Sequence, residues 1–216
     1  RGKNLKFSHR GVVSLAWAED GGSLLEDPRP TLFFVTEDAQ TKRASLFWRQ
    51  GLGEDQPTRL FEERDERFNL YVAKTRSLGL LVLNSTSHTT SETRILPADQ
   101  PRGRWRIVVK RRAGVEYEID HHSDTLFMRT NDLGPNFRLV RTQLADWQAA
   151  NWQEVLPLRD DVVLEGIELY RDSLICSERK GGVSQLAITD LANKAAAEMR
   201  HRIEALLRAP LGAMWV

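Results

Sequence analysis

The chain has 216 residues, of which 41% are hydrophobic and 28% are charged, and 31 Lys and Arg stand against 30 Asp and Glu. These proportions are typical of a globular protein and exclude the disordered and fibrous classes. Acidic residues flank both basic clusters, which argues against the segregated positive face that a nucleic-acid-binding protein needs.

The sequence lacks two features that would indicate a membrane or an oxidising compartment. No apolar run approaches the roughly 20 residues that cross a bilayer, so no membrane partner is expected. The one cysteine, Cys176, cannot form an internal disulfide, which is typical of a reducing compartment and predicts a cytoplasmic protein.

Short apolar runs bounded by Gly, Pro, Asp and Asn recur about every ten residues, a pattern typical of all-β proteins with many short strands. The first eight expected strands are residues 12–17, 31–36, 45–49, 58–63, 68–73, 78–84, 91–96 and 105–110. Seven more are expected at residues 115–120, 125–130, 137–142, 154–157, 162–170, 174–177 and 185–189.

One of these strands recurs at a fixed spacing. The segments "TLFFVTED", "GLLVLNSTS", "TLFMRTND" and "SLICSERK" resemble one another, and their leucines lie 48, 46 and 48 residues apart (Leu32, Leu80, Leu126 and Leu174). Each segment has an extended run before it and another after it, and the first three units end in a fourth run. Four strands at such a period are typical of a blade of a β-propeller.

The sequence therefore predicts an all-β fold, a partial β-propeller of about four four-stranded antiparallel blades plus the start of a fifth. The blades are expected at residues 11–63, 64–112, 113–159 and 160–208, with the next beginning at residue 212. Because the chain stops inside a blade, we expect it to be part of a longer polypeptide. Residues 191–209 fit an amphipathic helix as well as an outer strand near 199–205, and the pattern does not decide between them.

The stretch "NSTSHTTSETRIL" (residues 84–96) places serines, a histidine and a carboxylate close together in sequence, as in a catalytic triad. A serine hydrolase also needs a Gly-x-Ser-x-Gly turn to present its nucleophile, and this sequence contains none. Hydroxyl side chains in turns bond nearby backbone groups, so a turn is the better interpretation and no catalytic residue is expected.

Asp120-His121-His122 is the one motif that suggests a metal. Adjacent residues of a strand point to opposite faces, so the two histidines cannot both face one ion without a bulge. Asp120 and His122 alone supply two ligands where zinc takes three or four. We therefore expect no metal and no cofactor.

Several motifs, in order along residues 12–190, are similar to the propeller domain of the oligopeptidase B branch of the prolyl oligopeptidase family of serine peptidases. The first are Phe61-Glu62-Glu63, Asp65-Glu66-Arg67-Phe68, Lys74-Thr75-Arg76-Ser77, Thr89-Thr90-Ser91-Glu92 and Asp99-Gln100-Pro101. Next come Gly114-Val115-Glu116-Tyr117, Asp120-His121-His122 and Asn136-Phe137-Arg138-Leu139-Val140-Arg141. The last are Trp152-Gln153-Glu154, Leu164-Glu165-Gly166, Ser177-Glu178-Arg179 and Gly181-Gly182.

The resemblance implies a non-catalytic propeller that caps an α/β-hydrolase domain of the same polypeptide and admits only short peptides, cleaved after Lys or Arg. The hydrolase domain carries the catalytic residues and is absent from these 216 residues, which cover about four of the seven blades implied by the resemblance. An open arc leaves blade faces uncovered, so the isolated chain is expected either to self-associate or to rearrange into a smaller closed ring. The alternative is a propeller-type scaffold that binds a protein partner and has no peptidase role.

The candidate site residues lie in or beside the loops between second and third strands, expected at residues 37–43, 85–90, 130–136 and 178–182. If that face meets the hydrolase domain, these loops form domain contacts or gate the substrate path. Glu165, inside an apolar strand, faces a central channel or pairs with an arginine. The residues so assigned are Ser85, His88, Thr89, Thr90, Arg129, Asn136, Phe137, Arg138, Glu165 and Arg179.

Overall fold

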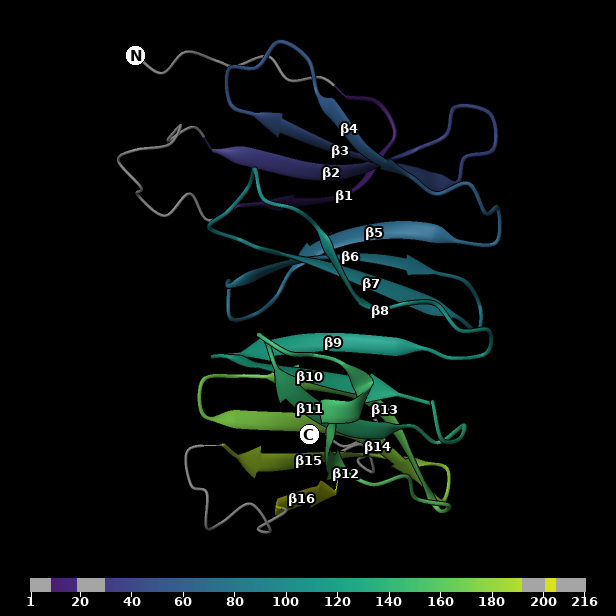
Figure 1. Cartoon of the computed structure of the whole chain (residues 1–216). Coiled ribbons are helices and arrows are strands. Elements are labelled where there is room, and N and C mark those ends of the chain that lie inside the picture. Colours follow the sequence, from purple (N-terminus) through teal and green to yellow (C-terminus); the bar gives the residue numbers. More distant parts are fainter. Residues whose placement is uncertain (1–8, 19–29, 192–200, 205–216) are drawn as a thin grey trace, which may run out of the picture. The chain divides into compact units, whose positions relative to one another are not determined.

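The computed structural model describes residues 9–18, 30–191 and 201–204, the last of these by their backbone alone. In these residues sixteen strands form four antiparallel sheets of four strands each (Figure 1). Sheet 1 contains β1 (Val12–Trp17), β2 (Thr31–Glu37), β3 (Ala44–Gly51) and β4 (Thr58–Glu62). Sheet 2 contains β5 (Asn69–Lys74), β6 (Leu80–Thr86), β7 (Ser91–Pro97) and β8 (Arg106–Val109).

The other two sheets follow the same order. Sheet 3 contains β9 (Tyr117–His122), β10 (Thr125–Thr130), β11 (Arg138–Gln143) and β12 (Gln153–Leu156), with the 3-10 helix η1 (Ala149–Asn151) before β12. Sheet 4 contains β13 (Val162–Leu169), β14 (Ser173–Lys180), β15 (Val183–Asp190) and β16 (His201–Glu204). The chain divides into two compact units, Arg1–Tyr117 and Glu118–Val216, and each is described by itself.

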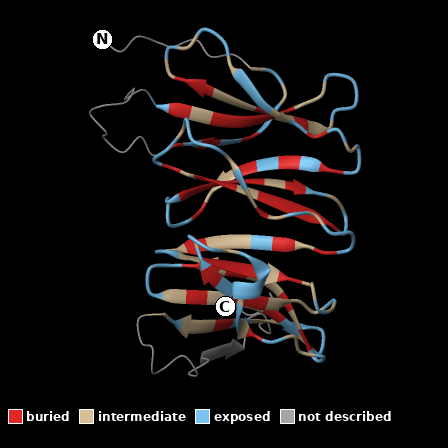
Figure 2. Cartoon of the chain, viewed as in Figure 1, coloured by how far each residue is buried: buried red, intermediate tan, exposed pale blue. Residues whose placement is uncertain are grey.

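In the first strands β1 and β5, buried residues alternate with exposed ones, so that one face packs against a neighbouring sheet of the unit, whereas the second strands β2, β6 and β10 are mostly buried on both faces. Figure 2 shows in red the buried residues that line the strands of the sheets. In the first unit, Ala16 of β1 and Leu70 and Val72 of β5 belong to one buried cluster. The Ser14 hydroxyl, on the same face of β1 as Ala16, accepts a hydrogen bond from the Val72 backbone N–H at 3.0 Å. The second unit has its own cluster, which joins Leu139 to Leu164, Leu169 and Leu174.

The predicted fold class, a partial β-propeller of four-stranded antiparallel blades, is confirmed. Residues 201–204 form a strand that pairs with β15, which favours the strand alternative over a helix there. The start of a fifth blade at residue 212 and the rest of the 191–209 stretch, apart from Leu191, lie outside the described residues. No helix in the described part of the chain is long and apolar enough to cross a membrane.

Every sheet has one end at which the chain passes to other sheets, and we call it the connection end. Neighbouring strands are antiparallel, so three features share this end of the sheet. They are the start of the first strand, the turn between the second and third strands, and the end of the fourth strand. In sheet 2, Asn69 pairs with Thr86, which pairs with Ser91. In sheet 4, Val162 pairs with Lys180, and the last residue of β16 pairs with Gln185 near the start of β15.

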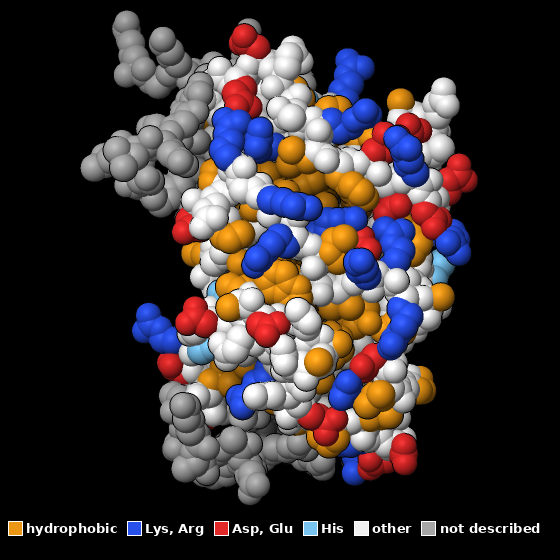
Figure 3. All heavy atoms as spheres, in the orientation of Figure 1, with side chains coloured by type: hydrophobic (Ala, Val, Ile, Leu, Met, Phe, Trp, Pro, Cys, Tyr) orange, Lys and Arg blue, Asp and Glu red, His pale blue; other side chains and the backbone are white. Residues whose placement is uncertain are grey.

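The face of β1 that points away from sheet 2 carries an exposed apolar stripe. Val13, Leu15 and Trp17 alternate with the buried Ser14 and Ala16, and 47%, 55% and 44% of their surfaces are exposed. Figure 3 shows, on one face of the protein, further hydrophobic side chains exposed among Lys and Arg side chains. An apolar stripe on a first strand is what a propeller blade presents to a neighbouring blade.

Candidate functional site

The stretch from residue 84 to residue 96 contains the end of β6, a turn and β7. Ser85 differs from the prediction, because it lies inside β6 rather than in the loop, and it is fully buried. In the turn, the Ser87 Oγ accepts a hydrogen bond from the Thr90 backbone N–H at 3.1 Å, and the Ser87 N–H donates to the Thr90 carbonyl at 2.8 Å. The predicted hydroxyl-bonded turn is therefore present at Ser87, whereas the Ser85, Thr90 and Ser91 hydroxyls bind groups outside it, and His88 and Thr89 are left exposed at its tip.

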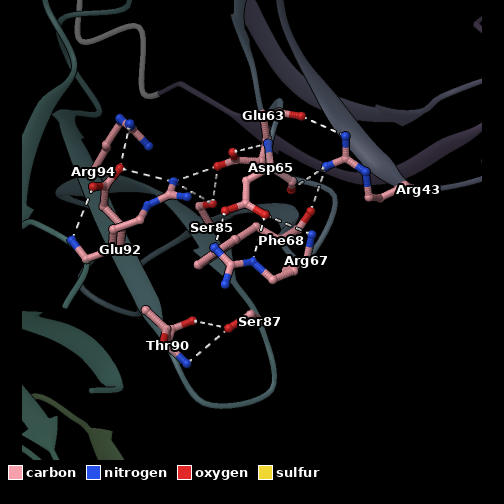
Figure 4. Close-up of polar contacts among 11 residues, drawn as sticks. Arg43, Glu63, Asp65, Arg67, Phe68, Ser85, Ser87, Thr90, Glu92 and Arg94 are labelled. Carbon is pink, nitrogen blue, oxygen red and sulfur yellow. Dashed lines mark hydrogen bonds and ion pairs between the residues drawn. The ribbon is translucent and has the colours of Figure 1, made fainter. Parts of the chain in front are cut away.

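The connection between sheets 1 and 2, residues 63–68, is held from both sheets (Figure 4). From sheet 1, the Arg43 guanidinium donates to the backbone carbonyls of Glu63, Asp65 and Phe68 at 2.8, 3.2 and 2.8 Å. From sheet 2, the Ser85 hydroxyl and the Arg111 Nη2 each donate to Glu63 Oε2 at 2.6 Å.

Each of two carboxylates in this network is paired with an arginine, Glu63 with Arg111 and Asp65 with Arg67. Burial alone raises the pKa of the Glu63 carboxyl, but hydrogen bonds from Arg111, Ser85 and the Asp65 backbone outweigh it, so the pKa of Glu63 is lowered from its ordinary value. Hydrogen bonds from the Arg67 side chain and backbone lower the pKa of Asp65 to about 2. Both carboxyls are therefore ionised at neutral pH, and their role is electrostatic.

A cavity of about 520 Å³ opens at the connection end of sheet 2. Its walls come from three segments that are far apart in sequence: the 63–68 connection, the β6–β7 turn and the connection after β8. Phe68 is buried at its base with the Arg111 guanidinium 4.1 Å from the ring centroid. The lining residues are Arg67, Phe68, Ser87, His88, Thr89, Thr90, Arg111, Ala113 and Gly114. The cavity thus gathers the three predicted residues His88, Thr89 and Thr90, but not Ser85.

In the second unit, two of the predicted residues, Arg129 and Asn136, join sheet 3 to sheet 4. The Arg129 Nε donates to the Leu164 carbonyl at 2.7 Å, and its guanidinium lies 3.7 Å from the centroid of the Phe137 ring. The Asn136 side-chain amide donates to the carbonyls of Arg159 and Asp160, in the connection that follows β12.

Arg138, the first residue of β11, makes its contacts within sheet 3. Its Nε and Nη2 bind both carboxylate oxygens of Asp132 at 2.8 and 2.7 Å, within the β10–β11 loop. Phe137, beside it, has a φ of 59°, a left-handed conformation that is unusual for a bulky side chain. The loop therefore has a specific conformation rather than an adaptable one.

Glu165 and Arg179 face each other across β13 and β14. The Arg179 Nε donates to Glu165 Oε1 at 2.6 Å, so Glu165 pairs with an arginine, one of the two alternatives raised by the sequence. Glu165 lies at a bulge between Leu164 and Gly166. Arg179 belongs to β14 rather than to the loop, which is reduced to the turn at Gly181-Gly182.

The Asp120-His121-His122 motif makes structural contacts. The Asp120 carboxylate accepts hydrogen bonds from the backbone N–H groups of His121 and Leu169. His121 is buried, whereas His122 Nε2 lies 2.7 Å from the Arg171 carbonyl oxygen. Among the described residues, no group of three or more His, Cys, Asp and Glu side chains could hold a metal ion.

Sequence reasoning missed Arg43, Glu63 and Arg111 as residues that position the site. A signal existed, because a charged residue recurs in the connection that leads to each of two blades. Glu63 precedes sheet 2 and binds Ser85 of β6, and Arg159 precedes sheet 4 and binds Glu178 of β14, with Nη2 at 2.7 Å from Oε1. The contact from the connection to the second strand thus occurs in both blades, but a glutamate accepts from a serine in one and an arginine donates to a glutamate in the other. A search for identical residues therefore cannot find it.

Comparison with known proteins identifies the lineage of this fold. The family model described as "Prolyl oligopeptidase, N-terminal beta-propeller domain" matches residues 12–211. Among curated proteins, the uncharacterized peptidase y4sO of Sinorhizobium fredii is 32% identical over 176 residues, which are 77% of this chain and 24% of that protein. Protease 2 of Moraxella lacunata is 31% identical over 157 residues, which are 72% of this chain and 22% of that protein.

Two solved structures of oligopeptidase B share the fold. The enzyme from Leishmania major superposes with a TM-score of 0.70 at 24% identity, over 82% of this chain and 24% of that chain. The enzyme from Trypanosoma brucei, in a closed form with covalently bound antipain, superposes with a TM-score of 0.66 at 27% identity, over 74% of this chain and 23% of that chain. The chain thus spans less than a quarter of the length of these relatives. With the family model matched over residues 12–211, the chain belongs to the prolyl oligopeptidase family of peptidases, as part of its N-terminal β-propeller domain.

Proposed function

We propose that this chain is the non-catalytic propeller portion of an oligopeptidase B-like serine peptidase that cleaves short peptides after Lys or Arg. The observation that carries the proposal is the propeller-domain match over residues 12–211, in a chain that spans less than a quarter of its relatives. The catalytic serine belongs to an α/β-hydrolase domain elsewhere in the polypeptide, since these 216 residues contain no Gly-x-Ser-x-Gly turn.

The propeller's own task is to restrict access to the active site by size. Contacts between neighbouring sheets support this, because Arg43 and Arg129 tie connections and strands of adjacent blades together and keep the blades from separating. The loops at the connection ends, with His88 and Thr89 at one tip, form contacts with the hydrolase domain or gate the path of the peptide. The buried Cys176, the one cysteine of the sequence, supports a reducing, cytoplasmic location.

The complete polypeptide tests this function. We expect it to hydrolyse an arginyl amide with a kcat/KM about two orders of magnitude above that for a prolyl or glutamyl amide, because a charged side chain is recognised by specific polar groups. Arginine-containing peptides of increasing length are expected to be cleaved until they exceed the size that the propeller admits. A serine-directed inhibitor should abolish the activity, and the 216-residue chain alone should have none.

Preference for the prolyl amide would contradict the Lys/Arg specificity. Equal cleavage of short peptides and folded proteins would contradict the access role. A complete polypeptide that hydrolyses none of the amides would instead support the scaffold alternative, a propeller that binds a protein partner.

The exposed stripe on β1 gives a separate prediction for the 216-residue chain. Without a neighbouring blade over Val13, Leu15 and Trp17, we expect the chain to self-associate through this face, with a mass in light scattering that rises with concentration. Leu15→Lys should shift the equilibrium to monomer. Tyr71→Lys is the matched control, since Tyr71 is equally exposed on β5 but does not lie in the stripe. A concentration-independent monomer for the unsubstituted chain would contradict this prediction.

A further inference from the structure

The cavity at the connection end of sheet 2 presents hydrogen-bond donors that no described residue of the chain accepts from. The Arg67 Nε and Nη2 bind Asp65, and the Arg111 Nη2 binds Glu63 and Ser85. Within the described parts of the chain, the Nη1 groups of both arginines have no hydrogen-bond acceptor, and the side chains of His88 and Thr89 have no partner. These four side chains lie around one cavity, and 79% of the Arg67 side chain is exposed.

The chemistry of these groups selects an acidic ligand. Arginine N–H groups, a histidine ring and a threonine hydroxyl can all donate to oxygen, and the planar guanidinium matches a carboxylate in geometry. Phe68 and Ala113 provide an apolar base that would accommodate the methylene groups of a Glu or Asp side chain. A Lys or Arg side chain of a substrate would meet two guanidinium groups and be repelled.

The topology of the sheets indicates where such a carboxylate comes from. In sheet 1, β1 begins at the connection end, and in sheet 4, β16 finishes at the connection end of its own sheet. A domain joined to either end of a run of such blades therefore leaves from this end of a sheet. The matched family domain is N-terminal, and the curated relatives are more than three times as long as this chain, so a large C-terminal part remains to cover that end.

We infer that the cavity around Arg67, His88 and Thr89 is a docking site for an acidic side chain of the hydrolase domain of the same polypeptide. This inference rests on the proposed function and adds to it a specific contact. Docking inserts one carboxylate between the arginine Nη1 groups and the β6–β7 turn. The contact stabilises the closed arrangement of the two domains, and it is weakened by salt because Arg67 and His88 are exposed to solvent.

Two substitutions in the complete polypeptide test the docking site. Arg67→Glu reverses a charge at the cavity, and His88→Glu adds a negative charge at a side chain with no contacts to lose. Arg64→Glu, in the same connection, and Thr86→Glu, at the end of β6, are matched controls, since both residues are exposed and neither lines the cavity.

The closed-to-open equilibrium is measured by small-angle X-ray scattering and by the rate of cleavage between the domains by a protease. We expect both cavity variants to shift the closed-to-open equilibrium at least about tenfold toward the open form, and neither control to do so. A tenfold shift corresponds to the loss of one close charge pair. High salt should open the unsubstituted protein and leave the cavity variants unchanged. His88→Glu should not alter the unfolding of the 216-residue chain, which separates lost docking from lost folding.

Hydrolysis of the arginyl amide is recorded for every variant and keeps the two hypotheses apart. If the unsubstituted protein cleaves the amide and the cavity variants open no more than the controls, the docking site is refuted and the proposed function stands. If no amide is cleaved but the cavity variants still open the protein, the docking site stands and the peptidase function fails. Stabilisation of the 216-residue chain by inorganic phosphate through Arg67 and His88, with closure unaffected by either variant, would overturn docking in favour of a small anion.

Discussion

Replacing Phe33 with alanine is expected to lower the free energy of unfolding by about 3–5 kcal/mol, the cost of truncating a fully buried phenylalanine. Phe33 has no exposed surface, and its ring lies 6.0 Å from Phe47 and 5.5 Å from Trp105, measured between centroids. The three rings contact one another, so the substitution leaves a cavity in the first unit and removes two aromatic contacts. Urea unfolding followed by tryptophan fluorescence measures the loss.

Tyr71→Ala is the control for Phe33. Tyr71 lies in β5 of the same unit, but 55% of its surface is exposed, so its truncation should cost less than about 1 kcal/mol. Phe33→Leu should fall between the two, because leucine fills part of the cavity. If Phe33→Ala and Tyr71→Ala had equal effects, the aromatic cluster would not be the core of this unit.

Glu63→Ala is expected to destabilise the chain by about 2–3 kcal/mol. The substitution leaves the Ser85 hydroxyl buried without its acceptor and Arg111 without its closest carboxylate. Removing one partner of a buried ion pair costs about 3–5 kcal/mol, and we lower that value because 29% of the Arg111 side chain is exposed. Glu62→Ala, which removes the adjacent, exposed carboxylate and its pair with Arg59, should change stability by less than about 0.5 kcal/mol.

The contribution of Glu63 also has a defined pH dependence. Its pKa is lower in the folded chain than its ordinary value of 4.5, so between those two pKa values the unfolded chain binds more protons and stability rises with pH. The contribution is therefore complete above pH 4.5 and is lost as the pH falls through the folded pKa. The difference in unfolding free energy between the unsubstituted chain and Glu63→Gln should shrink over that acidic range. A difference that stayed constant there would show that the Glu63 charge has no role.

The elements that could be predicted from the sequence are those decided by local patterns. The alternation in β1, the apolar run in β10 and the Gly-Gly turn after β14 depend on neighbours within a few residues, and β1 and β10 have the expected bounds, whereas β14 is longer than expected. The self-bonded turn at Ser87 and Thr90 was predictable for the same reason, because its donors and acceptors are three residues apart.

The candidate site was predicted only in part, because charge pairing depends on distant segments. Arg111 and Glu63 are 48 residues apart and meet because two sheets pack face to face. The same packing buries Ser85, whose place in the sequence had indicated an exposed loop. No periodicity in the sequence carries that information.

The sequence by itself determined the four-stranded repeat and the family, since hydrophobic alternation and ordered motifs are properties of a linear chain. The tertiary structure alone decided that the loop tip at His88 and Thr89 lies on the same cavity as Arg67. It also decided that Glu63, in the connection, binds Ser85 of β6. The physical reason is that strands form from local preferences, whereas a site forms where the packing of separate sheets brings charges together and determines which donors remain unpaired.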